Sequence, residues 1–159
     1  MLTIITDENP ILRKKSIPIN PKEIQTKELK KLYKNMIDTM QIKNGIGLAA
    51  PQIGKNICLI VIQLETIPNI KQIFKKNLSN VIMINPKITR KSWSKESGEE
   101  GCLSIPDVYG KVKRYKKITC TYLDADNKLQ KIKVEKLLAR VIQHEIDHLN
   151  GVLFTDKVA

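Results

Sequence analysis

Residues Gln143–His148 read QHEIDH, and they lie in a stretch from Lys136 to Asn150 whose apolar residues recur with helical spacing. In a helix, the four-residue spacing places the imidazoles of His144 and His148 on one face, one turn apart, where they can bind one metal ion. Glu145 would point to the same side, near a water molecule on that ion. The chain has no other histidine. Two hydrogen-bonded histidines on a buried helix face are the alternative interpretation.

A catalytic metal site needs a third protein ligand and one open position for water. The residues that follow His148 include no histidine and no glutamate, so we expect the third ligand upstream. Cys102 is the best candidate because it follows a glycine in a segment of turn-forming residues. Cys58 and Cys120 lie inside apolar or β-branched stretches, which is typical of buried thiols without a ligand role. A Cys-His-His set with an open fourth position predicts a hydrolytic metal centre, whereas an inert core thiol is the alternative for Cys102.

Residues 45–54 read GIGLAAPQIG and form a third distinctive segment. No predicted strand precedes it, as a dinucleotide-binding turn would require, and it lacks the Lys-Ser/Thr ending of a phosphate-binding loop. A glycine-rich turn is one interpretation. The other is a backbone that lies close to a ligand, with the side-chain amide of Gln52 as a hydrogen-bond donor.

The remaining pattern predicts an α+β fold, in which small antiparallel or mixed sheets pack around a C-terminal metal-binding helix. A second, amphipathic helix is expected near the N-terminus, over residues 26–41, because its apolar residues recur at steps of three and four. The C-terminal helix should stop at Gly151, since glycine suits the left-handed cap position. Short stretches rich in Ile, Val and Thr predict strands over residues 57–64, 80–85, 117–123 and 129–134, with a hairpin turn over 124–127. The 159 residues fit one domain, 1–159.

The charge composition raises nucleic-acid binding as the first non-enzymatic hypothesis. The chain has 28 Lys and Arg against 16 Asp and Glu, a net charge of +12. Only four of the cations are arginines and only 4% of the residues are aromatic, whereas base readout favours arginine and single-strand binding favours aromatic rings. The lysines are scattered, and we interpret most of them as solvated charges that raise solubility. No specific DNA partner is expected.

The sequence also predicts where the protein acts. The longest apolar run, residues 57–62, has six residues, and a membrane span needs about 20. Asp7 and Glu8 interrupt the region where a secretory signal would be apolar, so we expect the protein to stay in the compartment where it is made, the cytoplasm or its organellar equivalent. Three cysteines are too few for a disulfide framework and should stay reduced there.

Taken together, the three segments resemble the signatures of the peptide deformylases. The family's motifs are G-x-G-L-A-A-x-Q, E-G-C-x-S and Q-H-E-x-D-H-L-x-G, and the chain matches them in this order at residues 45–52, 100–104 and 143–151. The resemblance implies an enzyme that removes the N-formyl group from the initiator methionine of nascent polypeptides and releases formate. It spans the whole chain and includes the opening segment 7–13, which is similar to that of family members.

The resemblance also implies roles for individual residues. Cys102, His144 and His148 would hold one divalent metal ion, Fe²⁺ in family members, with Zn²⁺, Ni²⁺ or Co²⁺ able to occupy the site. Glu145 would act as general base and acid, and Gln52 with the backbone N–H of Leu103 would form the oxyanion hole. The substrate-binding residues implied in the same way are Ile46, Gly47, Leu48, Tyr109 and Val141. Of these, Tyr109 lies in a segment, residues 106–110, that resembles organellar-type members and would place its ring in the methionine pocket.

One departure from the family concerns its partners. Several bacterial members continue after the metal-binding helix into a helical tail that is similar to a ribosome-docking element, whereas this sequence ends 11 residues after His148. This departure puts docking by that route in doubt, and diffuse attraction of the lysines to ribosomal RNA is the hypothesis for a transient contact. A monomer is expected. The hypothesis from another class is a basic RNA- or ribosome-associated binding module with a non-catalytic metal site.

Overall fold

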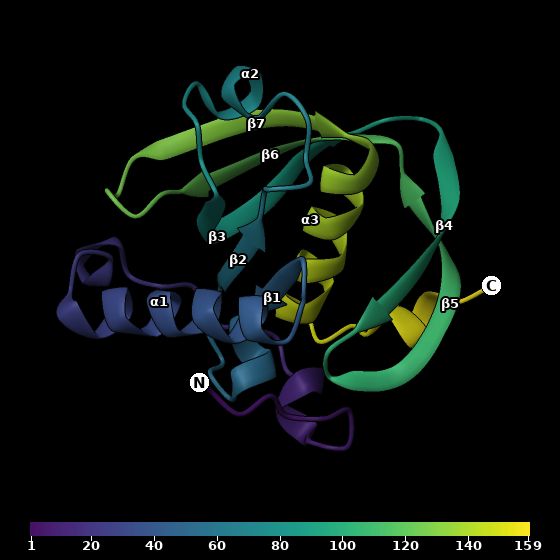
Figure 1. Cartoon of the computed structure of the whole chain (residues 1–159), viewed down its shortest axis with the longest axis horizontal. Coiled ribbons are helices and arrows are strands. Elements are labelled where there is room, and N and C mark those ends of the chain that lie inside the picture. Colours follow the sequence, from purple (N-terminus) through teal and green to yellow (C-terminus); the bar gives the residue numbers. More distant parts are fainter.

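The computed structural model describes residues 1–159, which form two antiparallel sheets and three α-helices (Figure 1). The larger sheet has the strand order β1 (Gly47–Ala49), β2 (Leu59–Gln63), β3 (Asn80–Lys91), β6 (Lys117–Leu123) and β7 (Leu129–Glu135). The second sheet is the hairpin of β4 (Lys95–Cys102) and β5 (Ile105–Tyr115). The helices are α1 (Lys27–Ile42), α2 (Ile70–Phe74) and α3 (Lys136–Leu149). The predicted α+β class is confirmed.

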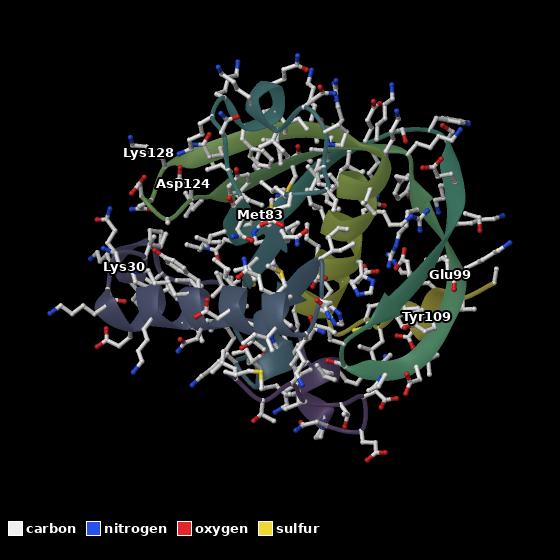
Figure 2. The ribbon with its side chains drawn as sticks, viewed as in Figure 1. Lys30, Met83, Glu99, Tyr109, Asp124 and Lys128 are labelled. Carbon is white, nitrogen blue, oxygen red and sulfur yellow. The ribbon has the colours of Figure 1, made fainter.

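Strand β2 is buried on both faces, which explains its uninterrupted run of apolar residues. Successive side chains of a strand point to opposite faces of the sheet. Ile60 and Ile62 accordingly pack in the hydrophobic cluster that also contains the apolar face of α3, whereas Leu59 and Val61 pack in the cluster that contains α1. Met83 of the neighbouring strand β3 is fully buried in the α3 cluster, near the centre of the molecule (Figure 2).

Helix α3 lies between the two sheets, with the five-stranded sheet on one side and the β4–β5 hairpin on the other (Figure 1). A third, smaller cluster joins the hairpin to both ends of the chain. Its buried members are Leu12, Ile105, Val112, Leu153 and Phe154. Apolar packing of Ile105, at the turn of the hairpin, and of Val112 of β5 therefore anchors the hairpin to both ends of the chain beside α3.

The structure differs from the sequence prediction mainly at the hairpin. Strand β3 continues to Lys91 where the prediction ends at residue 85, and β1, α2, β4 and β5 were not predicted. Strands β4 and β5 are rich in Lys, Glu and Gly, and they pair with each other along a largely exposed ribbon, so they lack the alternation on which strand prediction depends. The turn over 124–127 is confirmed, with Asp124 Oδ1 accepting hydrogen bonds from the N–H groups of Asp126 and Lys128. None of the helices combines the length and apolar character needed to cross a bilayer.

Gly151 follows the end of α3, and Gly54 serves as its control because both glycines have a left-handed backbone conformation but only Gly151 has a close neighbour. Both have positive φ, +73° and +83° respectively, a conformation that costs other residues about 1–2 kcal/mol. A Cβ on Gly151 would lie 2.4 Å from the backbone oxygen of Arg13, whereas a Cβ on Gly54 would meet nothing within 4 Å. We therefore expect Gly151→Ala to lower the free energy of unfolding clearly more than Gly54→Ala, as measured by urea denaturation. Equal losses would contradict the proposed close contact.

Candidate metal centre

Helix α3 and the end of β4 bring the three predicted ligands together. The ligand atoms of Cys102, His144 and His148 all lie within 4.8 Å of one another. Cys102 Sγ is 3.4 Å from His148 Nε2, and the two imidazole rings meet edge to face with their centroids 5.0 Å apart. A soft thiolate and two imidazoles at this spacing can share one transition-metal ion.

Glu100 fixes the orientation of His144. Its Oε1 is 2.9 Å from His144 Nδ1, which leaves Nε2 of the ring free to face Cys102. Metal-binding histidines commonly use their second nitrogen in this way, because the bond to a carboxylate fixes both tautomer and ring orientation. The Glu100 side chain is only 5% exposed, so its charge needs partners inside the protein.

Arg114 and Arg140 supply those partners. Arg114 donates to both oxygens of Glu100, at 2.9 and 2.8 Å, and Arg140 Nη1 donates to Oε2 at 2.7 Å. Burial alone would raise the pKa of Glu100, but the hydrogen bonds from Arg114 and His144 outweigh it and hold the pKa far below its ordinary value. Arg114 also donates to Asp147 of α3, between the two histidines in sequence. These arginine contacts join the hairpin to the helix at the site.

The two histidines differ in their proton affinity. Burial lowers the pKa of His148 well below its usual value, so its imidazole is neutral and its lone pair is available to a metal. Burial acts on His144 in the same direction, but hydrogen bonds to Cys102 and Glu100 outweigh it and raise the pKa of His144 to about 10. A divalent ion would displace the extra proton of His144 when it binds, which fits a metal site.

Glu145 is a buried carboxyl that lacks a complete set of partners. Its side chain lies against the backbone of Gly47, because a Cβ on that glycine would come within 2.6 Å of Glu145 Oε1. Its Oε2 is buried and has no hydrogen-bond partner. Burial is the main cause that raises the pKa of Glu145 to about 7, so both protonation states are available near neutral pH. A carboxyl in this state can both accept and donate a proton.

Gln52 faces the thiol from the other wall of the site. Its Oε1 accepts from the Ala49 N–H at 2.9 Å, and its Nε2 donates to Cys102 Sγ at 3.3 Å and to Ser104 Oγ at 3.1 Å. The side chain is almost fully buried, so the direction of its amide is fixed. The Leu103 side chain packs beside Gly45, where an added Cβ would lie 2.9 Å from Leu103 Cδ1.

The cleft at this seam has a volume of about 590 Å³. It is lined by most of the predicted site residues, namely Ile46, Gly47, Gln52, Cys102, Leu103, Tyr109, Val141, His144 and Glu145. Tyr109 is largely exposed on the outer ribbon of the hairpin, together with Glu99 (Figure 2). Its ring covers Gly101, where a Cβ would come within 2.7 Å of Tyr109 Cε1.

Leu48 and His148 do not line the cleft. The side chain of Leu48 is fully buried in the α1 cluster, because the alternation of β1 points it away from its neighbour Gly47. The side chain of Leu48 therefore lies away from the cleft, and the role of this residue in substrate binding stays a prediction. His148 lies behind Cys102, 1% exposed, as suits a ligand at the rear of the site.

Sequence reasoning missed Arg114, Arg140 and Asp147. One signal was available, because arginine is rare in this lysine-rich chain and two of its four arginines make the charged contacts with Glu100. The flat, forked guanidinium suits a buried carboxylate better than an ammonium does. Gln143, the neighbour of the first histidine, has a packing role: its amide exchanges two hydrogen bonds with the backbone of Tyr115, at 3.0 and 2.9 Å.

A thiolate and two imidazoles can hold a metal ion, and a buried carboxyl beside them in an open cleft can activate water. This combination is typical of metal-dependent hydrolases. The family model for polypeptide deformylase matches residues 1–159. A peptide deformylase from Desulfotalea psychrophila is 41% identical over 159 residues, which is 100% of this chain and 88% of the relative. The chain therefore belongs to the polypeptide deformylase family, which is a family of metalloenzymes.

Solved structures agree with this assignment. The crystal structure of peptide deformylase from Thermotoga maritima has a TM-score of 0.89 at 34% identity, over 100% of this chain and 98% of that one. A peptide deformylase from Synechococcus elongatus, solved in complex with actinonin, has a TM-score of 0.87 at 41% identity, over 99% of this chain and 79% of that one. The alternative of an RNA-binding module with a non-catalytic metal site is not supported.

The three cysteines provide an internal test of the ligand set. We expect Cys102→Ser to lower the metal content of the purified protein severalfold, because an alcohol is a poor substitute for a thiolate. Cys120→Ser should retain the metal but lose stability, since this thiol is fully buried in the core and its burial raises its pKa to about 11. Metal content per chain by plasma mass spectrometry, with Cys58→Ser as a second control, would measure this. Equal metal loss in all three variants would contradict the assignment.

Proposed function

We propose that this chain hydrolyses the N-formyl group of the N-terminal formylmethionine of nascent polypeptides, within one catalytic domain that spans residues 1–159. The reaction breaks the formamide C–N bond and yields formate and a free amine. The observation that carries the proposal is the unpartnered Glu145 carboxyl beside the Cys102, His144 and His148 ligand atoms, in an open cleft of a chain that belongs to the deformylase family.

Cys102, His144 and His148 would hold one divalent ion. Such an ion, when bound, lowers the pKa of a water molecule and polarises a carbonyl oxygen. Glu100 holds the His144 ring in place, and Gln52 fixes the direction of the thiol by donating to its sulfur. The burial of Glu100 and its arginine partners keeps this arrangement rigid.

Glu145 moves the protons of the reaction. Its unpartnered Oε2 takes a proton from the attacking water, and the same oxygen later gives that proton to the amine that leaves. A carboxyl with a pKa near 7 is suited to both transfers at neutral pH. Gly47 is needed opposite this carboxyl because any side chain there would overlap Glu145 Oε1.

Gln52 and Leu103 stabilise the negative charge that develops on the formyl oxygen. The Gln52 amide, held in one direction by its burial and by the bond of its Oε1 to the Ala49 N–H, would donate to that oxygen from Nε2, and the backbone N–H of Leu103 would provide a second donor. Ile46 and Gly47 belong to the edge of the larger sheet, where the peptide backbone would lie. Val141 and Tyr109 would contact the methionine side chain.

Fe²⁺ is the ion that we propose for this site, with Zn²⁺, Ni²⁺ or Co²⁺ able to replace it. Protein purified without air should contain iron and lose activity in air, because a thiolate beside ferrous iron can be oxidised to sulfinic or sulfonic acid. Zinc has no redox chemistry, so the zinc-loaded protein should be stable in air. Mass spectrometry of the inactivated protein should find the added oxygen on the peptide with Cys102. Oxidation confined to Cys58 or Cys120 would contradict this proposal.

The proposal extends to partners and place of action. The substrate is a nascent polypeptide, and we propose that the protein meets it in the cytoplasm as a monomer, with transient contact to the ribosome. Specific DNA is not proposed as a partner, because only four of the 28 cationic residues are arginines, the side chain that base readout favours.

Formate release from a formyl-Met tripeptide tests the proposed reaction directly, with the unformylated tripeptide as the control for general peptidase activity. We expect the iron-loaded protein to release formate from the first substrate and to leave the peptide bonds of the second intact. Glu145→Gln should retain the metal and lose about 10²- to 10⁴-fold in turnover, because no base remains to activate the water. A variant that keeps a tenth of the activity would contradict the role of Glu145.

A further inference from the structure

Trp93 is the only tryptophan of the chain, and its side chain is 101% exposed at the turn between β3 and β4. The turn that carries it is ordered by hydrogen bonds. The Ser92 N–H donates to the Lys117 carbonyl at 2.8 Å, the Ser92 hydroxyl donates to the Ser94 carbonyl at 2.8 Å, and the Lys116 N–H donates to that same carbonyl at 3.1 Å. The indole ring is therefore presented to solvent from a fixed backbone, although a ring of this size is usually buried.

A basic groove begins beside this turn, at Ser92. It has a volume of about 730 Å³ and lies between the start of α2, the ends of the larger sheet and the start of α3. Five cationic side chains and one acid line it: Arg90, Lys91, Lys117, Lys133, Lys136 and Glu135. The acid lies 3.5 Å from Lys117 on an exposed surface, so it offsets at most one of the five positive charges.

Positive charge also surrounds Trp93 on its own ribbon. The ammonium groups of Lys91 and Lys95 lie 5.1 and 4.7 Å from the centre of the Tyr115 ring. These two lysines precede and follow the turn, and the aromatic ring holds both near it. An exposed indole is thus flanked by cations that continue into the groove.

We propose that Trp93 and this groove form a binding site for single-stranded RNA. A base would stack on the indole ring while phosphates follow the line of cations, which is how proteins bind single strands without reading their sequence. Asn69 and Gln72 add side-chain amides to the groove wall that can donate to phosphate or base. The low aromatic content of the chain does not oppose this site, because its one tryptophan directly follows Ser92, which lines the groove.

The surroundings of Trp93 favour a nucleic acid over a membrane surface. Binding at a membrane interface requires a contiguous apolar area. Trp93 instead has a serine on each side, and among the apolar residues that line the groove Ile118 and Leu138 are only 3% and 2% exposed, whereas Leu137 is exposed but isolated among charged neighbours. Cations around a single aromatic ring can contact the phosphates of a nucleic acid while the ring stacks on one of its bases.

This site is separate from the metal centre but close to it. Leu137 lines both the basic groove and the catalytic cleft, and none of the metal ligands or Glu145 lines the groove. A strand in the groove would therefore lie next to the cleft without covering the catalytic residues. The inference does not depend on the proposed deformylase reaction.

The single tryptophan makes the test direct, because intrinsic fluorescence reports on Trp93 alone. We expect a 12-nucleotide oligo(U) RNA, titrated into the whole chain at low salt, to quench this fluorescence. Inorganic polyphosphate should compete for the site but leave the fluorescence largely unchanged, since it has phosphates and no bases. With labelled RNA, Trp93→Ala should weaken binding about fivefold or more in fluorescence anisotropy, as expected for the loss of one stacked base, and Trp93→Tyr should restore part of it.

Charge removal at two places separates the groove from general attraction. The variant K91A/K117A/K133A removes three groove lysines, and K30A/K31A/K34A removes three from α1, on the opposite side of the molecule from β4 (Figures 1 and 2). Only the first should lower the slope of log affinity against log salt by about two, given about 0.7 per phosphate contact on single strands. Both variants and Trp93→Ala should keep the formate-releasing activity of the parent protein.

Three results would overturn the proposal. The first is RNA binding without quenching of Trp93. The second is an equal loss of affinity in both lysine variants, which would indicate diffuse attraction. The third is tighter binding to anionic phospholipid vesicles than to RNA.

Discussion

The buried carboxylate of Glu100 is the charge on which the organisation of this site depends. From β4 it accepts hydrogen bonds from Arg114 of β5 and from Arg140 and His144 of α3. Removing one partner of such a buried cluster leaves an uncompensated charge, which costs about 3–5 kcal/mol. The hairpin and α3 are therefore held in one relative position, and Cys102 and the histidines are held with them.

The distribution of cations shows two distinct uses of positive charge. Arginine carries the buried contacts at the metal centre, where a planar guanidinium can bond to both oxygens of one carboxylate. Lysine carries the exposed charge, including most of the basic groove beside Trp93. A net charge of +12 is thus compatible with a catalytic cleft whose key groups are a neutral histidine and a carboxyl poised near neutrality.

The cleft lies where the larger sheet, the β4–β5 hairpin and α3 meet, and each of these three parts of the chain supplies one of its walls. Edge strand β1 supplies Gly47, the hairpin supplies Cys102 and Tyr109, and α3 supplies Glu145. Burial on both faces of β2 fixes the first wall against α3, and the small cluster that includes Ile105 and Val112 of the hairpin fixes the second. The hairpin leaves the larger sheet and meets α3 through polar contacts, such as Arg114 with Asp147 and Arg140 with the Glu96 carbonyl, and the cleft opens beside these contacts.

The sequence by itself determined the α+β class, the turn at 124–127 and the histidine pair, because helical spacing and turn chemistry are local properties. It also indicated Cys102, by eliminating ligands downstream. Only the tertiary structure decided that Arg114 and Arg140 meet at Glu100, that Leu48 turns into the core, and that Trp93 stands beside a basic groove. Strands β4 and β5 escaped prediction for a different reason: they pair with each other in a largely exposed ribbon, so neither segment has the alternation of apolar and polar residues that marks a half-buried strand.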